Sequence, residues 1–253
     1  MLLQVLIKPA PSERRGTQEA IRGLWIGPRL SAMERMSIVS FLRLGHPFEL
    51  YTYAPVEDVP EGTSVCDGRE ILAPEEVFAY AGGPGRGSFA AFSNLFRYKL
   101  LLDGGGWWVD LDTIALRPFA FERPYIFGWQ TGGSIGCGVL RAPAQSELMR
   151  ECFETAKSAG REIWWGQIGP VLLTDVVQKL GLVESCEPAE SFYPVPYTDW
   201  GRLVEPGGTI PESSHAVHLW HEMWRRQGWD PDAAYHPESI YGRLKARLLG
   251  VDQ

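Results

Sequence analysis

The chain has 253 residues, of which 45% are hydrophobic, and a formal net charge of -7 at pH 7. A chain of this length and composition can bury one sizeable core, so we expect a single domain over residues 1–253. The acidic balance argues against nucleic acid as a partner, because a phosphate backbone requires a basic surface.

The first residues and the cysteines bear on the location of the protein. Residues 1–19 are expected to form a loosely ordered segment, and their apolar part, residues 1–7, is too short for a signal-peptide core or a membrane span. The four cysteines form no Cys-x-x-Cys pair, which is typical of free thiols in a reducing compartment. We therefore expect a cytoplasmic protein.

Two strands with a helix between them are predicted next. Residues 21–26 form the first strand, a capping box at residues 31–34 begins a helix that ends at Gly45, and residues 48–53 form the second strand. Such a right-handed unit is typical of nucleotide-binding folds. Its first turn lacks the Gly-x-Gly-x-x-Gly that holds a diphosphate, so a diphosphate must be bound elsewhere.

The stretch from residue 92 to residue 119 carries the most informative motif. It predicts a helix capped by Ser93, a stop at residues 104–106, and an apolar strand that delivers Asp110 and Asp112. Side chains alternate along a strand, so both carboxylates would lie on one face. Two like charges this close favour a divalent cation between them, and oxygen ligands favour Mg²⁺ or Mn²⁺.

The helix before this motif adds a positive charge. Asn94 and Arg97 are three residues apart and share a helix face, and the glycines allow that face to approach the end of the strand. A guanidinium beside a cation site suits a diphosphate. A second Asp-x-Asp, at residues 230–232, stands in a proline-containing turn and is expected to cap or solvate that loop.

The second half of the chain is predicted to continue the alternation of strands and helices. A strand at residues 125–129 leads into a glycine-rich run at residues 131–140, which is either a tight bend or a wall that a ligand approaches. Helices follow at residues 143–160 and 171–180. The apolar stripe at residues 240–248 belongs to a last helix with a solvated outer face, so at most peripheral membrane contact is expected.

Histidines near the C-terminus suggest zinc at first sight. His215, His218 and Glu222 would share a helix face, but the fixed ligand spacing of zinc enzymes is not recognisable here. A histidine packed at a strand end remains the alternative to a ligand role for His218.

The pattern from Ser93 to Asp112 resembles the DxD sugar-nucleotide signature of the glycosyltransferases that include the yeast initiating mannosyltransferase, globotriaosylceramide synthase and the clostridial toxin glucosyltransferase domains. This resemblance implies an α/β, GT-A-like fold: a Rossmann-type mixed sheet flanked by helices. It implies a metal-dependent hexosyltransferase that moves a sugar from a nucleotide-sugar donor, expected to be a UDP-sugar, to a glycan or glycolipid acceptor with retention. Residues 20–118 would form the nucleotide-binding half, and residues 119–253 the acceptor side.

The resemblance also implies roles for individual residues. Asp110, Asp112 and His218 would bind Mn²⁺ or Mg²⁺, and Gln167 would contact the donor sugar unless it is a surface amide. With Asp110, Asp112 and Arg97, Gln167 completes the expected catalytic set. The indole of Trp25 would stack on the base of the donor, and Trp220 or Trp224 would contact the diphosphate. The donor-binding residues are expected to be Trp25, Gly27, Asn94, Arg97, Asp110, Trp220 and Trp224.

Two other classes of protein compete with this interpretation. A haloacid-dehalogenase-like phosphohydrolase would use Asp110 as nucleophile and Asp112 as acid and base, although no later metal motif of that class is found. A carbohydrate-binding module without enzymatic activity is supported by the ten tryptophans, whose faces can stack on sugars. That last interpretation leaves the paired carboxylates and Arg97 unexplained.

Overall fold

The computed structural model describes residues 18–250, and every structural statement below concerns this part of the chain. The expectation for the first residues falls almost wholly on residues 1–17, outside the described part. Among the described helices, none combines the length and the apolar character needed to cross a lipid bilayer. The cytoplasmic location stays a prediction.

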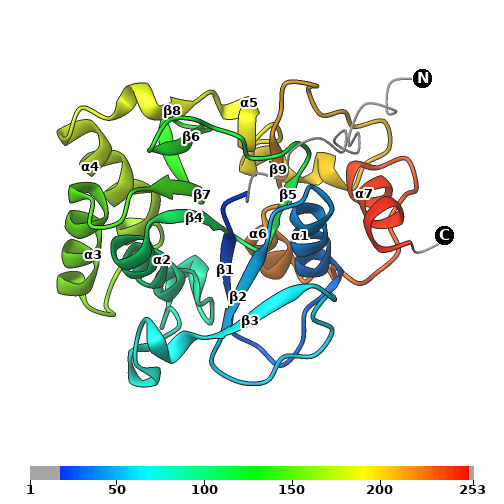
Figure 1. Ribbon diagram of the computed structural model, residues 1–253. Coiled ribbons are helices and arrows are strands. Elements are labelled where there is room, and N and C mark those ends of the chain that lie inside the picture. Colours follow the sequence, from blue (N-terminus) through cyan, green and yellow to red (C-terminus); the bar gives the residue numbers. More distant parts are fainter. Residues whose placement is uncertain (1–17, 251–253) are drawn as a thin grey trace.

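A mixed sheet of seven strands, in the order β3-β2-β1-β4-β7-β6-β8, forms the centre of the molecule (Figure 1). Strands β3, β2, β1 and β4 are parallel neighbours, whereas β7 runs antiparallel to both β4 and β6. A separate two-stranded ladder joins β5 to β9. The strands are β1 (Ile21–Trp25), β2 (Phe48–Thr52), β3 (Thr63–Asp67), β4 (Gly106–Val109), β5 (Thr113–Ala115), β6 (Ile126–Gln130), β7 (Ser134–Ala142), β8 (Cys186–Glu187) and β9 (Ala216–His218).

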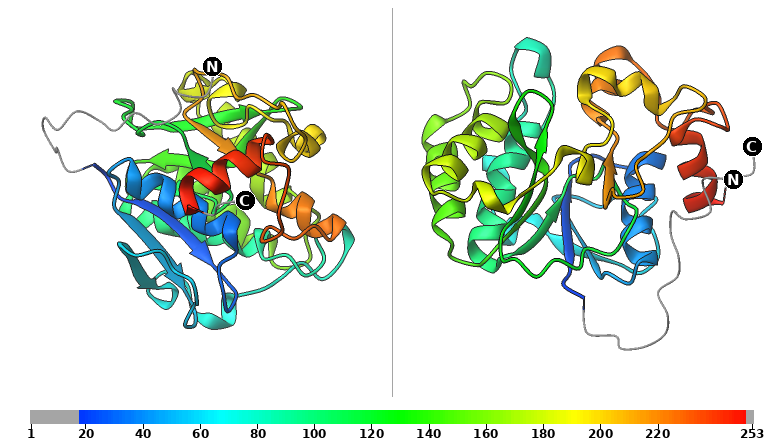
Figure 2. Two further views of the ribbon diagram at one scale, coloured as in Figure 1. Left: turned by 90° about the vertical axis from the view of Figure 1, so that its right-hand side faces the viewer. Right: turned by 90° about the horizontal axis from the view of Figure 1, so that it is seen from above.

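Helices cover both faces of this sheet (Figure 2). Helices α2, α3 and α4 lie on one face, and α1 lies on the other face with α7 against it. Trp107 and Trp108 of β4 point to opposite faces, and each is buried in the core of its own side. The helices are α1 (Ala32–Arg43), α2 (Ala90–Gly104), α3 (Glu147–Ala159), α4 (Leu172–Lys179), α5 (Ala189–Phe192), α6 (His221–Gln227) and α7 (Ile240–Leu249). The predicted α/β, GT-A-like fold, a mixed sheet flanked by helices, is confirmed.

The predicted strand-helix-strand unit is present as β1, α1 and β2. Ser31 and Glu34 form the capping box at the start of α1, where the Ser31 hydroxyl accepts the backbone N–H of Met33 at 3.2 Å. Two other predicted helix starts are wrong. Helix α2 begins at Ala90, so that Ser93 lies within it, and α3 begins after the cap residue Ser146.

The apolar stripe of α7 faces the protein interior. Ile240, Leu244 and Leu248 are buried in one cluster with Met33 and Met36 of α1. Burial of these side chains between two helices removes the apolar face that a membrane surface would need. The predicted apolar stripe is thus confirmed as the buried face of this helix, and the expectation of at most peripheral membrane contact stays a prediction.

His46 lies in the connection between α1 and β2 and is buried as a neutral imidazole. Its Nε2 accepts the backbone N–H of Phe119 at 3.0 Å, and its Nδ1 lies 3.2 Å from the carbonyl oxygen of Glu19. Burial lowers the pKa of His46, only partly opposed by the Glu19 contact. In the unfolded chain the pKa is about 6.5. Stability from the neutral ring is therefore present above that value and is lost as the pH falls through the folded-state pKa.

We expect His46→Gln to reduce this pH dependence, because the amide does not titrate. Urea unfolding at about pH 7.5 and about pH 5.5 measures it as the difference in free energy of unfolding between the two conditions. The unaltered protein should lose more stability on acidification than the variant. Equal losses in both proteins would contradict the role assigned to His46.

Candidate metal and donor site

Asp110 and Asp112 lie in the turn between β4 and β5, not within a strand as predicted. Strand β4 ends at Val109. The N–H of Asp110 still donates to the carbonyl of Gly138 on β7 at 2.8 Å, and the chain then turns, with the N–H of Thr113 donating back to the carbonyl of Asp110 at 2.9 Å. This tight turn, and not strand alternation, directs the two carboxylates to one place.

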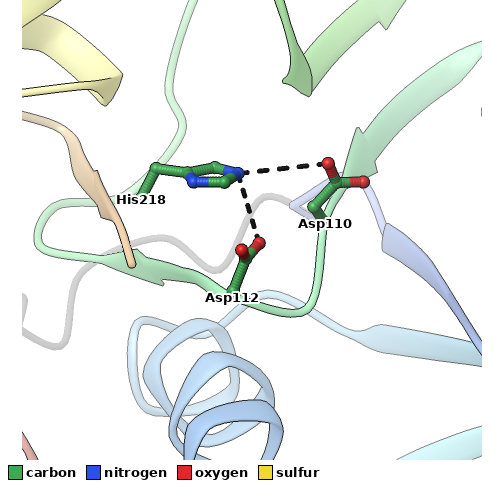
Figure 3. Close-up of side chains that lie close together, drawn as sticks. All are labelled: Asp110, Asp112 and His218. Carbon is green, nitrogen blue, oxygen red and sulfur yellow. Dashed lines mark ion pairs between the residues drawn. The ribbon is translucent and has the colours of Figure 1, made fainter. Parts of the chain in front are cut away.

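His218 reaches the turn through the ladder between β5 and β9. Thr113 pairs with His218 in this ladder, and the N–H of Leu219 donates to the carbonyl of Asp112 at 2.8 Å. The imidazole Nε2 consequently lies 3.2 Å from Asp112 Oδ1 and 4.0 Å from Asp110 Oδ2 (Figure 3). One potential ligand atom from each of the three residues lies within 4.8 Å of the others. The expected helix face of His215, His218 and Glu222 is wrong, since His218 ends a strand.

Asp110 Oδ1 and Asp112 Oδ2 are held by the protein. Asp112 Oδ1 faces His218, and Asp110 Oδ2 lies 3.4 Å from Arg97 Nη1 and 4.0 Å from His218 Nε2. Asp110 Oδ1 accepts the indole N–H of Trp108 at 3.0 Å and pairs with Arg97 Nη2 at 2.9 Å. Asp112 Oδ2 accepts the backbone N–H of His221 at 2.8 Å. Such outer contacts orient metal ligands, and two carboxylates with one imidazole suit Mn²⁺ or a similar divalent cation. The three residues therefore fit the predicted metal, and their role as its ligands stays a prediction.

Arg97 is buried behind Asp110, which confirms that its helix face approaches the Asp turn. Its Nε donates to the carbonyl of Ser93 at 3.1 Å, its Nη2 donates to the Ser93 hydroxyl at 2.8 Å, and its Nη1 donates to the carbonyl of Cys137. The guanidinium also lies over the Trp108 ring, 4.9 Å from its centroid. With its donors used inside the protein, Arg97 is built to position Asp110, and direct contact with a diphosphate stays a prediction.

Burial and charge act in opposite directions on the pKa values of this cluster. Burial alone raises the pKa of Asp110, but the charges of Arg97 and His218 outweigh it, and the pKa lies below its ordinary value. Burial lowers the pKa of His218, and the two carboxylates outweigh this and raise it. The Asp110 side chain is 28% exposed, so the cluster opens to solvent. The two carboxylates face only one permanent positive charge, that of Arg97, so a further cation would balance the charge of the cluster.

Trp25 and Gly27 stand beside this cluster at the end of β1. The Trp25 ring lies nearly parallel to His221, with centroids 6.4 Å apart and planes 15° apart. Its indole N–H is buried without a hydrogen-bond partner and lies against Gly27, where a Cβ would be 3.0 Å away. An unpartnered donor of this kind suits a ligand oxygen. Stacking of Trp25 on a base stays a prediction.

Asn94 and Gln167 lie on the α2 side of the site. Asn94 is 6% exposed and contacts Gly169, where a Cβ would be 2.7 Å from the amide nitrogen. The Gln167 side chain accepts the backbone N–H of Trp164 at 3.1 Å and so closes a local turn. Contacts of these two amides with a donor stay predictions.

The two predicted phosphate-contacting tryptophans differ in exposure. Trp224 has no exposed surface, and its indole N–H donates to the carbonyl of Leu219 at 2.8 Å, so its predicted contact with the diphosphate is wrong. The Trp224 ring is buried in the same apolar cluster as Ile240 and Leu244 of α7. Trp220 is half-buried beside His218, and its indole N–H donates to the carbonyl of Val195 at 2.7 Å. That N–H is thus not free for a phosphate.

His221 is a site residue that sequence reasoning missed. Its backbone holds Asp112, and its ring lies between Trp25 and the buried carboxylate of Glu34, with Nδ1 3.3 Å from Glu34 Oε1. Burial raises the pKa of Glu34, partly opposed by the charge of His221. The available signal was its place three residues after His218, which did not distinguish it from a surface histidine.

The glycine-rich run in β7 is explained by the rings that pack against it. A Cβ at Gly138 would lie 2.6 Å from Cδ2 and 2.7 Å from Nε2 of His218, and a Cβ at Gly136 would lie 2.4 Å from the Tyr193 ring. These glycines admit protein rings. The bend expected in the run is present at residues 131–133, which form the turn between β6 and β7 with Gly132 and Gly133 at positive φ. Contact of the run with an acceptor stays a prediction. Gly138 allows His218 to lie close to Asp112.

We expect Gly138→Ala to weaken Mn²⁺ binding by about tenfold or more, because the added methyl group displaces the imidazole. Isothermal titration with Mn²⁺ in the presence of UDP measures the affinity. Gly104→Ala is the control, since a Cβ there meets only Arg22 Nη1 at 3.4 Å. Unchanged affinity in Gly138→Ala would show that the position of His218 does not matter for the metal.

Over part of its length, the chain is similar to proteins that are named as glycosyltransferases. Residues 142–247 match the family model described as the alpha 1,4-glycosyltransferase conserved region. The human alpha-1,4-N-acetylglucosaminyltransferase is 25% identical over 146 residues, 52% of this chain and 42% of that protein. The mouse lactosylceramide 4-alpha-galactosyltransferase is 27% identical over 173 residues, 61% of this chain and 46% of that protein. The chain thus spans less than half the length of these two relatives.

The predicted resemblance to this glycosyltransferase family is therefore confirmed, since the human and the mouse relative are both named as glycosyltransferases. The Asp turn itself precedes the matched region, which includes His218. Two solved structures align over 92% of the chain at 11% identity: the PaToxG glycosyltransferase, with a TM-score of 0.48 and 85% of its length covered, and the GlyE glycosyltransferase of Streptococcus pneumoniae TIGR4, with a TM-score of 0.44 and 64% covered. At these scores neither structure bears on activity.

Proposed function

We propose that the protein is a metal-dependent glycosyltransferase that uses a nucleotide-sugar donor and a glycan or glycolipid acceptor. The observation that carries this proposal is the convergence of Asp110, Asp112 and His218 within 4.8 Å, with one oxygen of each carboxylate held by the protein. The resemblance to named glycosyltransferases makes a sugar diphosphate the ligand that suits such a cation site. A UDP-sugar is the preferred donor, and retention of configuration is part of the proposal.

Each residue of the site would have a separate role. Asp110, Asp112 and His218 would hold Mn²⁺ or Mg²⁺, and the bound cation would neutralise charge on a departing diphosphate. Arg97 fixes Asp110 by its ion pair, and the backbone of His221 fixes Asp112. Trp25 lies at the end of β1, where a base can stack beside the cluster.

Hydrolysis of sugar nucleotides in the absence of an acceptor tests the proposal. A panel of UDP- and GDP-sugars is incubated with the protein and Mn²⁺, and the released nucleoside diphosphate is measured. We expect hydrolysis of at least one donor that stops when EDTA removes the metal. Binding of free glycans without metal or nucleotide, and no hydrolysis of any donor, would instead favour a carbohydrate-binding module.

A further inference from the structure

Aromatic rings lead from the candidate metal site to the surface. The ring centroids of buried His218 and half-buried Trp220 are 4.3 Å apart, and those of Trp220 and Tyr197 are 5.9 Å apart. Tyr197 is 40% exposed. Exposure increases from one ring to the next, so Trp220 and Tyr197 line a surface that is continuous with the site.

Trp220 is held in place by three residues of one short segment. The Tyr193 ring lies 5.6 Å from Trp220 at an interplanar angle of 30°, the Val195 carbonyl accepts the indole N–H at 2.7 Å, and the Tyr197 ring meets Trp220 at 68°. Pro194 and Pro196 lie between these residues and restrict the backbone of the segment. Three contacts two residues apart hold the indole in one orientation.

What Trp220 can offer to a ligand is therefore a fixed apolar face. Its only polar side-chain atom is already bonded to the carbonyl of Val195. Its backbone lies in the left-handed region, at φ 58° and ψ 48°, which is an outlier for a bulky residue. Strained conformations of this kind persist where the surrounding structure requires them, often beside functional sites.

A fixed aromatic face with an exposed neighbour suits the apolar face of a sugar ring. The two charged side chains of the 3₁₀ helix that begins at Tyr197 (Tyr197–Leu203) are paired with each other, since Arg202 Nη1 lies 3.4 Å from Asp199 Oδ2. The surface therefore favours a neutral sugar. Tyr197 and Trp220 both belong to the half of the chain expected to bind the acceptor. We propose that Tyr197 and Trp220 form the platform on which the acceptor sugar lies, an inference that rests on the proposed function.

Lactose is the probe for this platform, because one relative is named a lactosylceramide 4-alpha-galactosyltransferase. Its affinity is measured by saturation-transfer NMR titration in the presence of UDP and Mn²⁺. We expect Tyr197→Ala to weaken lactose binding by up to about tenfold, the equivalent of one aromatic contact. Tyr197→Phe keeps the ring and should bind lactose like the unaltered protein.

Trp229→Ala is the matched control. Trp229 is also 40% exposed, but its ring contacts Trp200, Trp224 and Tyr235, away from His218. Its loss should leave lactose binding unchanged, and thermal unfolding verifies that each variant is folded.

Three results would overturn the platform. The first is that Tyr197→Ala binds lactose as tightly as the unaltered protein does. The second is that Tyr197→Ala loses affinity for UDP to the same extent as for lactose. The third is that the unaltered protein hydrolyses a donor but does not bind lactose. Failure of the proposed function is recognised separately, as the lack of metal-dependent hydrolysis of any sugar nucleotide by the unaltered protein.

Discussion

Asp112→Asn is expected to abolish metal-dependent hydrolysis of the donor while leaving the protein folded. The amide oxygen can still accept the N–H of His221, and the backbone carbonyl still accepts the N–H of Leu219, so the turn is kept. The variant loses the negative charge that faces His218 and that would bind the metal cation. Its Mn²⁺ affinity should fall by more than the roughly 10- to 100-fold that is typical of losing an outer contact of a metal ligand.

Isothermal titration with Mn²⁺ and release of nucleoside diphosphate measure the two effects. Asp230→Asn, in the second Asp-x-Asp, is the control. Asp230 Oδ1 accepts the N–H of Asp232 at 2.8 Å, which confirms that this copy caps its loop. Donor turnover retained in Asp112→Asn would remove the metal from the proposed mechanism.

Arg97→Met is expected to destabilise the fold by about 3 to 5 kcal/mol, the usual effect of removing one partner of a buried ion pair. The substitution leaves the carboxylate of Asp110 and the carbonyl of Cys137 without their guanidinium donor. Urea unfolding measures the loss. Lys99→Met on the same helix is the control, because the Lys99 and Asp103 side chains are 30% and 42% exposed and such pairs contribute less than about 1 kcal/mol.

The acid side of the stability profile tests the same ion pair. Arg97 and His218 keep the folded-state pKa of Asp110 below its ordinary value despite burial. The stabilisation is therefore present above the unfolded pKa of about 4 and is lost as the pH falls through the folded-state value. Arg97→Met should lose much of this dependence. A variant as stable as Lys99→Met, with an unchanged acid profile, would contradict the supporting role of Arg97.

Much of the fold was predictable because its signals act over a few residues. The capping box of α1, the apolar residues of β1 and β2, and the triple glycine at the end of α2 each specify local backbone geometry. Gly105 adopts a φ of 60°, and a Cβ there would lie 2.4 Å from the backbone nitrogen of Ala144, so this turn requires glycine. The errors in helix starts also have a local cause, since Ser93 is one of several possible caps.

The arrangement around the carboxylates was only partly predictable. The sequence indicated that Asp110 and Asp112 converge and that Arg97 approaches them, and the structure brings these groups together through a turn. Trp224 and Trp220 are similar in sequence context, but only the competition for burial under α7 decides that Trp224 is enclosed. Such competition depends on the whole core and leaves no local pattern.

The sequence by itself determined the order of most strands and helices, the paired carboxylates and the positive charge that accompanies them. Only the tertiary structure decided that β9 pairs with β5. This pairing places the His218 ring against Asp112 and lets the backbone N–H of His221 donate to the same carboxylate. Pairing of strands that are distant in the sequence requires a long loop to close, so it is set by the packing of the whole fold and not by local sequence. The tertiary structure likewise set Tyr193, Val195 and Tyr197 around Trp220, because contacts between distant segments are specified by packing and not by spacing along the chain.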